Sequence, residues 1–326
     1  MDETIKNFGE QLAWSPVMEN RDRWQKSDKF IVCGMGGSAL AAGLLRVAQP
    51  QLDLLVHRDY GLPRVPEYFL RESLIILSSY SGNTAETLDT GREALEMGLK
   101  LAVVTSGGPS AGLGVNKLLD WARQNGIPHI VLPAGLQPRM ALGYALKALG
   151  ALLGDEQMLA MLSTTTLTAT SLEAPGEALA SKLGSRIPVI YSSAVNFPLA
   201  YHWKIIFNET AKIPAFANAF PELNHNEMQS FDAVEETKDL VDKFAFIFLV
   251  DEHDDPRISK RFSVLKKLYS ERGLEVEEIN LTGATVWTKV FQSLILASWT
   301  AYYLAQKYQR DPNTVPMIEE FKKLVG

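Results

Sequence analysis

The sequence has a single cysteine, Cys33, and none of its apolar stretches is long enough to cross a membrane. A lone thiol excludes an intrachain disulfide and is typical of a reducing compartment, whereas a membrane-spanning helix needs about 20 mainly apolar residues. The first residues, MDETIKNFGEQLAW, have neither the basic nor the apolar region of a secretory signal. We therefore expect a cytoplasmic protein without a membrane partner.

The chain also lacks an excess of basic residues and a cluster of metal ligands. It has 32 Lys and Arg against 38 Asp and Glu, for a net charge of −6, and the two signs are interspersed, which argues against a nucleic-acid partner. The segment DEHDD at 251–255 contains metal-binding residue types, but it follows an expected strand as a charged turn. We interpret it as a solvated loop and predict neither a metal site nor a cofactor.

The 326 residues do contain two rounds of short apolar runs that alternate with helical patterns. In the first round, a strand, a turn and a helix are expected at 29–48 and again at 73–98. Further strands are expected at 52–57, at 99–108 (where a loop follows the strand) and at 123–135, and a helix at 139–154 closes the unit. Strands separated by helices in this way predict a parallel, doubly wound α/β sheet.

The second half repeats this pattern. It predicts a strand, a turn and a helix at 186–212, strands at 242–255 and 274–283, and helices at 255–273 and 288–308. Residues 155–184 are interpreted as a partly helical linker, so the expected domains are 1–154 and 155–326. A short likeness between ILSSYSGNT and VIYSSAVNFP suggests two copies of one α/β unit.

Small hydroxyl residues follow the expected strand at its carboxyl end in SSYSGNT. In open α/β sheets ligands bind beyond this end of the strands, where the next helix offers free N–H groups and the positive end of its dipole. Ser79, Ser81 and Thr84 lie at such a turn, beside Gly82, which permits close approach of the backbone. We predict a phosphate-binding turn; the alternative for Thr84 alone is an ordinary helix cap.

The earlier turn, CGMGGSALAA, is of the same kind. Gly36, Gly37 and Ser38 provide a place where sugar hydroxyls can lie against the backbone. Gly34, Gly36 and Ala39 also satisfy the weak pattern G-x-G-x-x-A of dinucleotide sites, with Asp59 as a candidate ribose ligand. A tight turn without any ligand is the third alternative.

These segments together resemble a known family. GMGGS followed by SYSGNTAET is similar to the sugar isomerase (SIS) domain, and FNETAKIPAFANAFPELNHNEM resembles the bifunctional phosphoglucose/phosphomannose isomerases. The likeness continues through PRMALGY and TKVFQSLILASWTAYYLA to DPNTVPMIEEFKKLV. It implies two SIS-type, flavodoxin-like subdomains, each with a parallel sheet flanked by helices. It also implies interconversion of glucose 6-phosphate and mannose 6-phosphate with fructose 6-phosphate through a cis-enediolate.

The resemblance assigns a proton shuttle to Glu209 in FNETAK. A carboxylate near the end of an apolar helix suits a base that works near neutral pH. From the residues alone, the alternative is a surface glutamate paired with Lys212.

His225, in LNHNEM, is the ring-opening group that the resemblance implies, and in the family this histidine reaches the active site of the neighbouring subunit. A homodimer is therefore expected. The other histidines, His57, His129, His202 and His253, are interpreted as solvated loop residues.

Arg139 and Lys289 complete the implied catalytic set. The family places the arginine near the oxygens on C1 and C2, where a guanidinium favours the enediolate, and the lysine at the sugar ring, where it assists ring opening. Without the resemblance, a surface arginine and a solvated helix residue are the alternatives.

Thr282 lies seven residues before Lys289, where the bifunctional enzymes have threonine and strict phosphoglucose isomerases have a larger glutamine. The smaller side chain leaves room for the C2 epimer, so mannose 6-phosphate is expected as a substrate. Thr285 takes this role if the register of the loop differs.

The main alternative function is a non-catalytic SIS module that senses sugar phosphates. Retention of Glu209, His225, Arg139 and Lys289 argues against it, because a sensor needs no proton shuttle. A glucosamine synthase is disfavoured because no glutaminase domain is recognisable, and an NAD-linked dehydrogenase is the weakest alternative.

Overall fold

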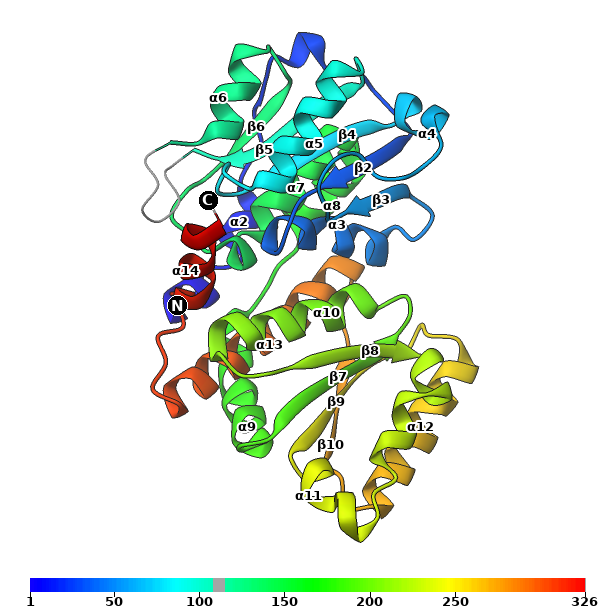
Figure 1. Ribbon diagram of the computed structural model, residues 1–326. Helices are drawn as coiled ribbons and strands as arrows, with labels where there is room; N and C mark the ends of the chain where they lie inside the picture. Colours follow the sequence, from blue (N-terminus) through cyan, green and yellow to red (C-terminus); the bar gives the residue numbers. More distant parts are fainter. Residues whose placement is uncertain (108–114, 326) are drawn as a thin grey trace. The chain divides into compact units, whose positions relative to one another are not determined.

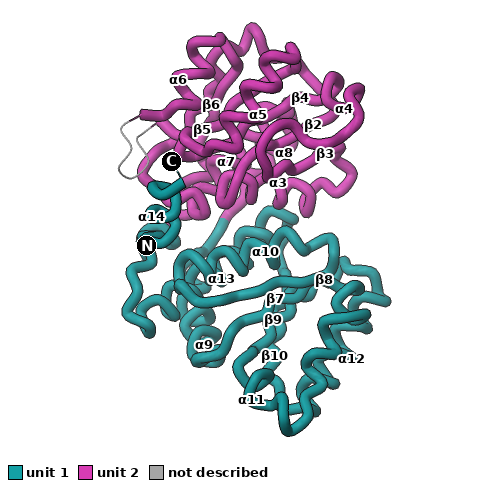
Figure 2. Tube along the Cα trace, viewed as in Figure 1, with its two compact units in different colours: residues 1–6, 167–326 teal, residues 7–166 magenta. Residues whose placement is uncertain are grey.

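The computed structural model describes residues 1–107 and 115–325 and divides them into two compact units (Figures 1 and 2). We call residues 7–166 the N-terminal unit, and residues 167–326 together with residues 1–6 the C-terminal unit. The last residue of the loop expected at 99–108 lies outside the described residues.

Among its described residues, the N-terminal unit contains a six-stranded sheet with the order β1-β6-β5-β4-β2-β3. The pairs formed by β2 to β6 are parallel, and only the short edge strand β1 runs antiparallel to its neighbour. The strands are β1 (Met18–Glu19), β2 (Lys29–Cys33), β3 (Asp53–His57), β4 (Leu74–Ser79), β5 (Lys100–Ser106) and β6 (His129–Leu132).

Helices cover both faces of this sheet, as the sequence pattern predicts (Figure 1). One face is covered by α2 (Glu10–Ala13), α3 (Gly37–Ala48), α7 (Leu142–Leu153) and α8 (Glu156–Thr164), and the other by α4 (Glu67–Glu72), α5 (Ala85–Glu96) and α6 (Lys117–Gln124). Because β2, β4 and β5 are buried on both faces, they are continuous apolar runs rather than alternating ones.

The C-terminal unit contains a four-stranded, wholly parallel sheet with the order β10-β9-β7-β8 among the described residues. Its strands are β7 (Ile187–Ser193), β8 (Phe216–Phe220), β9 (Phe244–Asp251) and β10 (Val276–Leu281). The sequence analysis missed β8, which has only five residues, of which only Phe220 is buried.

Helices also cover both faces of the second sheet (Figure 1). On one face lie α9 (Glu173–Leu183), α10 (Phe197–Ile206) and α13 (Val286–Lys307); on the other lie α11 (Lys238–Val241) and α12 (Pro256–Glu271). A cluster of aromatic rings, including Tyr191, Phe220, Phe246, Phe248 and Phe262, fills the core under α12. The predicted fold class, two parallel α/β sheets flanked by helices, is confirmed.

The two units are divided at other positions than the expected boundary between 154 and 155. Helix α8 belongs to the N-terminal unit, where the Asp155 side chain caps it and also accepts a hydrogen bond from Gln49 at 2.6 Å. Helix α1 (Asp2–Lys6) belongs to the C-terminal unit, because Ile5 is buried and Lys6 lies over the ring of Trp299. The expected linker is largely helical, since α8 and α9 occupy most of it.

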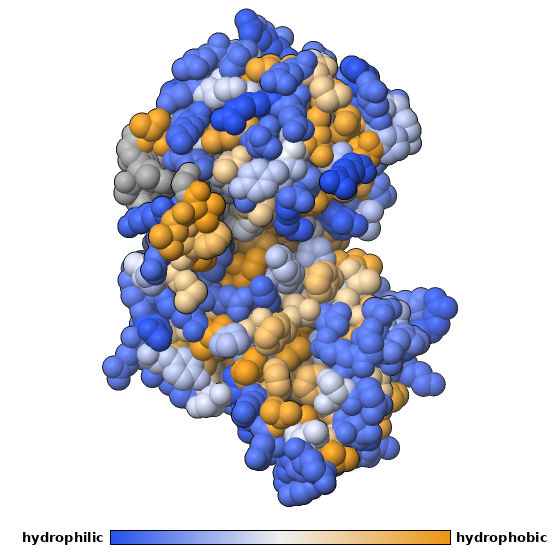
Figure 3. Space-filling model, viewed as in Figure 1, coloured by the Kyte–Doolittle hydropathy of each residue, from blue (hydrophilic) through white to orange (hydrophobic). Residues whose placement is uncertain are grey.

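Helix α14 (Pro316–Val325) shows an apolar surface, visible in orange in Figure 3. Its large hydrophobic residues Met317, Phe321 and Leu324 are all exposed. Among the described residues, no helix combines the length and the apolarity needed to span a membrane.

Candidate functional site

Three loops of the N-terminal unit meet at the carboxyl edge of its sheet, after β2, β4 and β6. Parallel strands end at the same edge, so the loops that follow them are neighbours. A Cβ atom on Gly34 would lie 2.5 Å from the carbonyl oxygen of Ser78, and one on Gly37 would lie 2.7 Å from the Pro138 side chain. Glycine at both positions therefore lets the three backbones pack against one another.

Ser38, in the first loop, holds the second loop in place. Its hydroxyl accepts a hydrogen bond from the Tyr80 amide at 2.9 Å, and its carbonyl oxygen accepts one from the Ser78 hydroxyl at 2.9 Å. Gly36 is exposed at the start of α3, and its backbone has a positive φ of 48° that favours glycine. Helix α3 has no side-chain cap, so its first N–H groups are not satisfied by a side chain of the capping residue.

The serines of the second loop divide into a buried and a half-buried group. Ser79 is buried; its hydroxyl lies 2.8 Å from that of Thr84 and accepts a hydrogen bond from the Gly82 amide at 3.1 Å. Ser81 and Thr84 are half-buried. Thr84 occupies the capping position of α5, but its side chain makes no capping hydrogen bond. Thr84 thus lies at the predicted cap position, but its side chain does not cap the helix.

Arg139 lies in a single helical turn, Pro138–Met140, just before α7. Its side chain is only 1% exposed, so the alternative of a surface arginine is wrong. The sequence analysis missed the residue that holds this turn: the buried Gln11 side chain donates to the Met140 carbonyl at 2.7 Å and accepts from the Gly143 amide at 3.0 Å. A distant side chain of this kind leaves no signal in the local sequence.

In the C-terminal unit, Glu209 lies in a π-helical turn, Phe207–Ala211, that continues α10. π-Helical turns are rare in proteins, and those that occur often lie at functional sites. Lys212 ends the turn in the left-handed conformation, with a φ of 57°, and its ammonium donates to the backbone carbonyl of Glu209 at 3.3 Å. Glu209 is half-buried, and the turn packs against α13.

His225 is exposed at the end of a short turn that follows β8. The residues next to it are held by hydrogen bonds: the Asn224 side chain accepts from Arg261 at 3.2 Å, and the Asn226 side chain donates to Glu222 at 2.7 Å. The Glu227 carboxylate accepts hydrogen bonds from the Tyr191 hydroxyl and from the Asn218 side chain. The loop thus holds its shape through its neighbours while the imidazole faces solvent.

Lys289 lies in the first turn of α13, and its ammonium contacts the Asp251 carboxylate at 2.5 Å. The preceding loop packs onto this turn, since a Cβ on Gly283 would lie 2.5 Å from the Lys289 amide nitrogen. Thr282 is exposed in this loop, whereas Thr285 caps α13 by accepting from the Thr288 amide at 3.1 Å. Thr285 therefore already has a structural role.

The predicted residues of the C-terminal unit do not all lie at one edge of its sheet. Thr282, Lys289 and His225 follow the carboxyl ends of β10 and β8, which are at the same edge. Glu209 follows the helix that returns the chain to the start of β8, and so lies toward the opposite edge of the parallel sheet.

Two expectations about polar residues need correction. The segment 251–255 is not wholly a solvated loop, because Asp251 is buried at the end of β9. Burial raises the pKa of Asp251, but hydrogen bonds from Lys289, the His253 amide and Asn196 outweigh this effect and hold it below its usual value. His129 and His202 are buried rather than solvated. Burial lowers the pKa of His202 to about 3.

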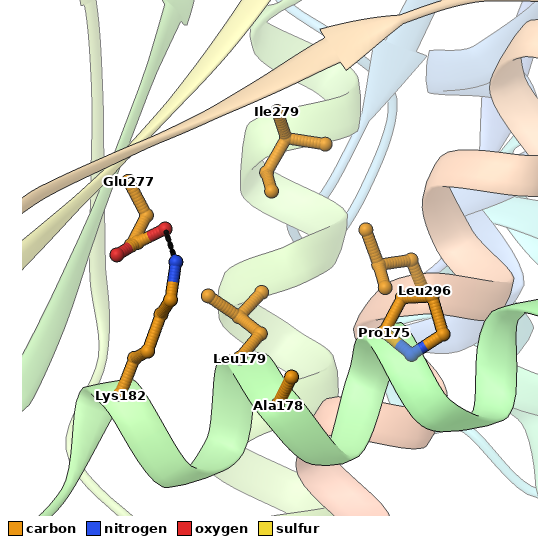
Figure 4. A pocket seen from close by; sticks show the side chains of 7 residues that line it. All are labelled: Pro175, Ala178, Leu179, Lys182, Glu277, Ile279 and Leu296. Atoms are coloured by element: carbon orange, nitrogen blue, oxygen red, sulfur yellow. Dashed lines mark hydrogen bonds and ion pairs between the residues drawn. The ribbon is translucent and has the colours of Figure 1, made fainter.

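A pocket of about 150 Å³ in the C-terminal unit is distinct from these residues (Figure 4). Its ion pair, in which Lys182 donates to Glu277 at 2.8 Å, leaves the charges of the walls balanced. It is lined by Pro175, Ala178, Leu179, Lys182, Glu277, Ile279 and Leu296. Because most of its walls are apolar, we assign it no role in binding a sugar phosphate. No group of three or more potential metal ligands is found within residues 1–107 and 115–325.

Comparisons with known proteins agree with this picture. Residues 172–325 match the family model "Bacterial phospho-glucose isomerase C-terminal SIS domain". A bifunctional phosphoglucose/phosphomannose isomerase of Thermoplasma volcanium is 32% identical and covers 98% of this chain and 99% of its own length. One from Caldicellulosiruptor bescii is 34% identical over 90% of this chain and 88% of its own.

Among solved structures, a hypothetical protein from Thermus thermophilus shares the fold. The match has a TM-score of 0.71 at 16% identity and covers 99% of this chain and 87% of the other. The near-full-length likeness to curated relatives above 30% identity shows that this chain belongs to the bifunctional phosphoglucose/phosphomannose isomerase family.

Proposed function

We propose that the protein interconverts glucose 6-phosphate and mannose 6-phosphate with fructose 6-phosphate through a cis-enediolate. Its curated relatives are bifunctional phosphoglucose/phosphomannose isomerases, which are intramolecular oxidoreductases: they move a proton and the oxidation state between two carbons of one substrate molecule. The observation that carries the proposal is the match to such a relative over 98% of this chain.

The phosphate group is assigned to the loop after β4. Ser81 and Thr84 offer half-buried hydroxyls beside the first turn of α5, which has no side-chain cap. The free N–H groups and the helix dipole stabilise a negative charge there. Ser79 supports the loop through its hydroxyl, which contacts the Thr84 hydroxyl and accepts from the Gly82 amide. Gly36, Gly37 and Ser38 in the adjacent loop are assigned to the sugar hydroxyls.

The proton transfer between C1 and C2 is assigned to Glu209. An isomerisation through an enediolate needs one base that removes a proton from one carbon and returns it to the other. The π-helical turn holds the Glu209 carboxylate half-buried, which limits its hydration. Arg139 supplies a fixed positive charge for the oxygens of the enediolate.

Ring opening is assigned to Lys289 and His225, and the functional unit is proposed to be a homodimer in which His225 serves the neighbouring subunit. The exposure of His225 supports this arrangement, because the side chain is accessible to a second copy of the chain. The exposed Thr282 is assigned to the tolerance of the C2 epimer.

The substrate assignment is tested by incubating the purified protein with fructose 6-phosphate, with and without EDTA, and measuring the two aldose products separately. We expect both glucose 6-phosphate and mannose 6-phosphate. Formation of neither product, although fructose 6-phosphate stabilises the fold, would support the non-catalytic sensor instead.

The dimer is tested by mixing two inactive variants, Glu209→Gln and His225→Ala, under conditions that exchange subunits. If His225 acts across the interface, each mixed dimer contains one site with both native residues, so activity returns. Absence of recovery in verified mixed dimers would place both residues in the same subunit's site.

A further inference from the structure

Lys289 lies at a position where a positive charge is unfavourable. It belongs to the first turn of α13, and the positive end of a helix dipole disfavours a cation there. The side chain is only 14% exposed, so water screens the ammonium poorly. The contact with the Asp251 carboxylate at 2.5 Å offsets both effects.

The Asp251 carboxylate is itself fixed at both oxygens. Oδ2 accepts from the Lys289 ammonium and from the Asn196 side chain at 3.2 Å. Oδ1 accepts from the His253 amide at 3.0 Å and lies 3.2 Å from the His253 ring. Asp251 also pairs with Leu281 of β10 at the end of β9, so both its backbone and its carboxylate are held in place.

A second carboxyl group, Asp254, lies beside this pair but differs from Asp251. Burial, together with the charge of Asp251, raises the pKa of Asp254. Its Oδ1 atom accepts from the Asn196 side chain at 3.5 Å, whereas its buried Oδ2 atom has no hydrogen-bond partner among the described residues, so Asp254 makes no contact with Lys289 like that of Asp251. The nearby Asp255 and Arg257 neutralise each other at 2.7 Å. Asp251 is thus the carboxylate that balances Lys289.

We propose that Asp251 is a positioning residue for the isomerase reaction, which holds the Lys289 ammonium in the orientation needed for ring opening. The inference rests on the role proposed for Lys289. A lysine side chain has four flexible carbons and loses much rotational freedom when it is fixed. Fixing it before the substrate arrives removes that loss from the reaction barrier.

The test compares Asp251→Asn with Glu252→Gln, which removes the same charge from the next, exposed residue. We expect Asp251→Asn to lower kcat for glucose 6-phosphate by about 10- to 100-fold and to leave KM nearly unchanged. We expect glucitol 6-phosphate, which cannot form a ring, to inhibit the native protein and both variants with the same inhibition constant. Glu252→Gln should keep native kcat.

A double-mutant cycle with Lys289→Met separates positioning from general damage to the fold. If Asp251 acts through Lys289, Asp251→Asn combined with Lys289→Met is no slower than Lys289→Met alone. Additive losses would overturn the proposal, as would native kcat in a folded Asp251→Asn variant.

Two further variants separate failure of the positioning role from a folding defect and from failure of the role proposed for Lys289. If Asp251→Asn does not fold, Asp251→Glu decides by the same criterion, because it keeps the charge but displaces it: lowered kcat supports the proposal and native kcat overturns it. If Lys289→Met itself keeps native kcat, the proposed role of Lys289 fails, and the role of Asp251 fails with it. A slow Lys289→Met beside a native Asp251→Asn overturns only the positioning role.

Discussion

The serine-rich turns that follow β4 and β7 have similar sequences but different environments. After β4, Ser81 and Thr84 remain half-buried beside the start of α5. After β7, the hydroxyl of buried Ser193 accepts from the Asn196 side chain at 3.2 Å, and Asn196 in turn donates to Asp251. The carboxyl groups of Asp251 and Asp254, which contact Asn196, disfavour a phosphate at the turn after β7. We therefore propose that the environment, rather than the residue types, separates an anion-binding turn after β4 from a structural turn after β7.

The two sheets can also be compared strand by strand. β2 is flanked by β3 and β4, and β7 by β8 and β9, so β7 occupies the place of β2 and β9 that of β4. The two serine-rich turns therefore follow strands that are not equivalent. In our account, the N-terminal unit binds the phosphate and stabilises the enediolate, whereas the C-terminal unit transfers the protons.

The largest effect is expected for the proton shuttle. Glu209→Gln should lower kcat on the order of 10³-fold and change KM little, because the amide keeps the shape but cannot accept the proton. Steady-state kinetics with fructose 6-phosphate measure this. A variant with near-native turnover would remove Glu209 from the mechanism.

The comparison of the two turns is tested by hydroxyl deletion. Ser81→Ala combined with Thr84→Ala should raise KM for phosphorylated sugars by about 10- to 100-fold, since each lost hydrogen bond to a charged group weakens binding. The matched control, Ser193→Ala, should lower the melting temperature without raising KM. Equal changes of KM in both variants would show that the two turns do not differ in function.

The C-terminal unit should also respond to acid through His202. The histidine is 0% exposed on α10, and its ring nitrogens have no hydrogen-bond partner in the described part of the chain. Its pKa falls from 6.5 in the unfolded chain to about 3 in the fold, so stability is present above pH 6.5 and is lost as the pH falls toward 3. Between pH 7 and pH 5 the loss is about 2 kcal/mol.

The measurement is urea unfolding at pH 7 and pH 5. His202→Leu, which removes the titrating group, should show a smaller difference between the two pH values than the native protein. An identical difference would mean that other groups determine the response to acid.

The smallest effect is expected at Thr282. Thr282→Gln should lower kcat/KM for mannose 6-phosphate about tenfold relative to glucose 6-phosphate, because the longer side chain occupies the space of the C2 epimer. Thr285→Gln should instead destabilise α13. Unchanged preference in Thr282→Gln would place the determinant of substrate range elsewhere.

The sequence predicts the α/β class and most strands because β2, β4, β5 and β9 are apolar runs bounded by turn residues. It fails where tertiary contacts decide. The short strand β8 is held by β7, Asp251 is buried by its pairing with Lys289, and Gln11 acts on a turn 129 residues away. The π-helical turn at Glu209 has no local sequence signal either.

The most direct test of the enediolate is isomerisation of glucose 6-phosphate in D₂O, followed by NMR of C1 of the fructose 6-phosphate formed. A proton removed by Glu209 exchanges with solvent while it is on the carboxylate, so we expect deuterium at C1 in the native protein. The Glu209→Gln variant should give neither product nor label. Rapid formation of fructose 6-phosphate with no deuterium at C1 would indicate a direct hydride shift and contradict the enediolate.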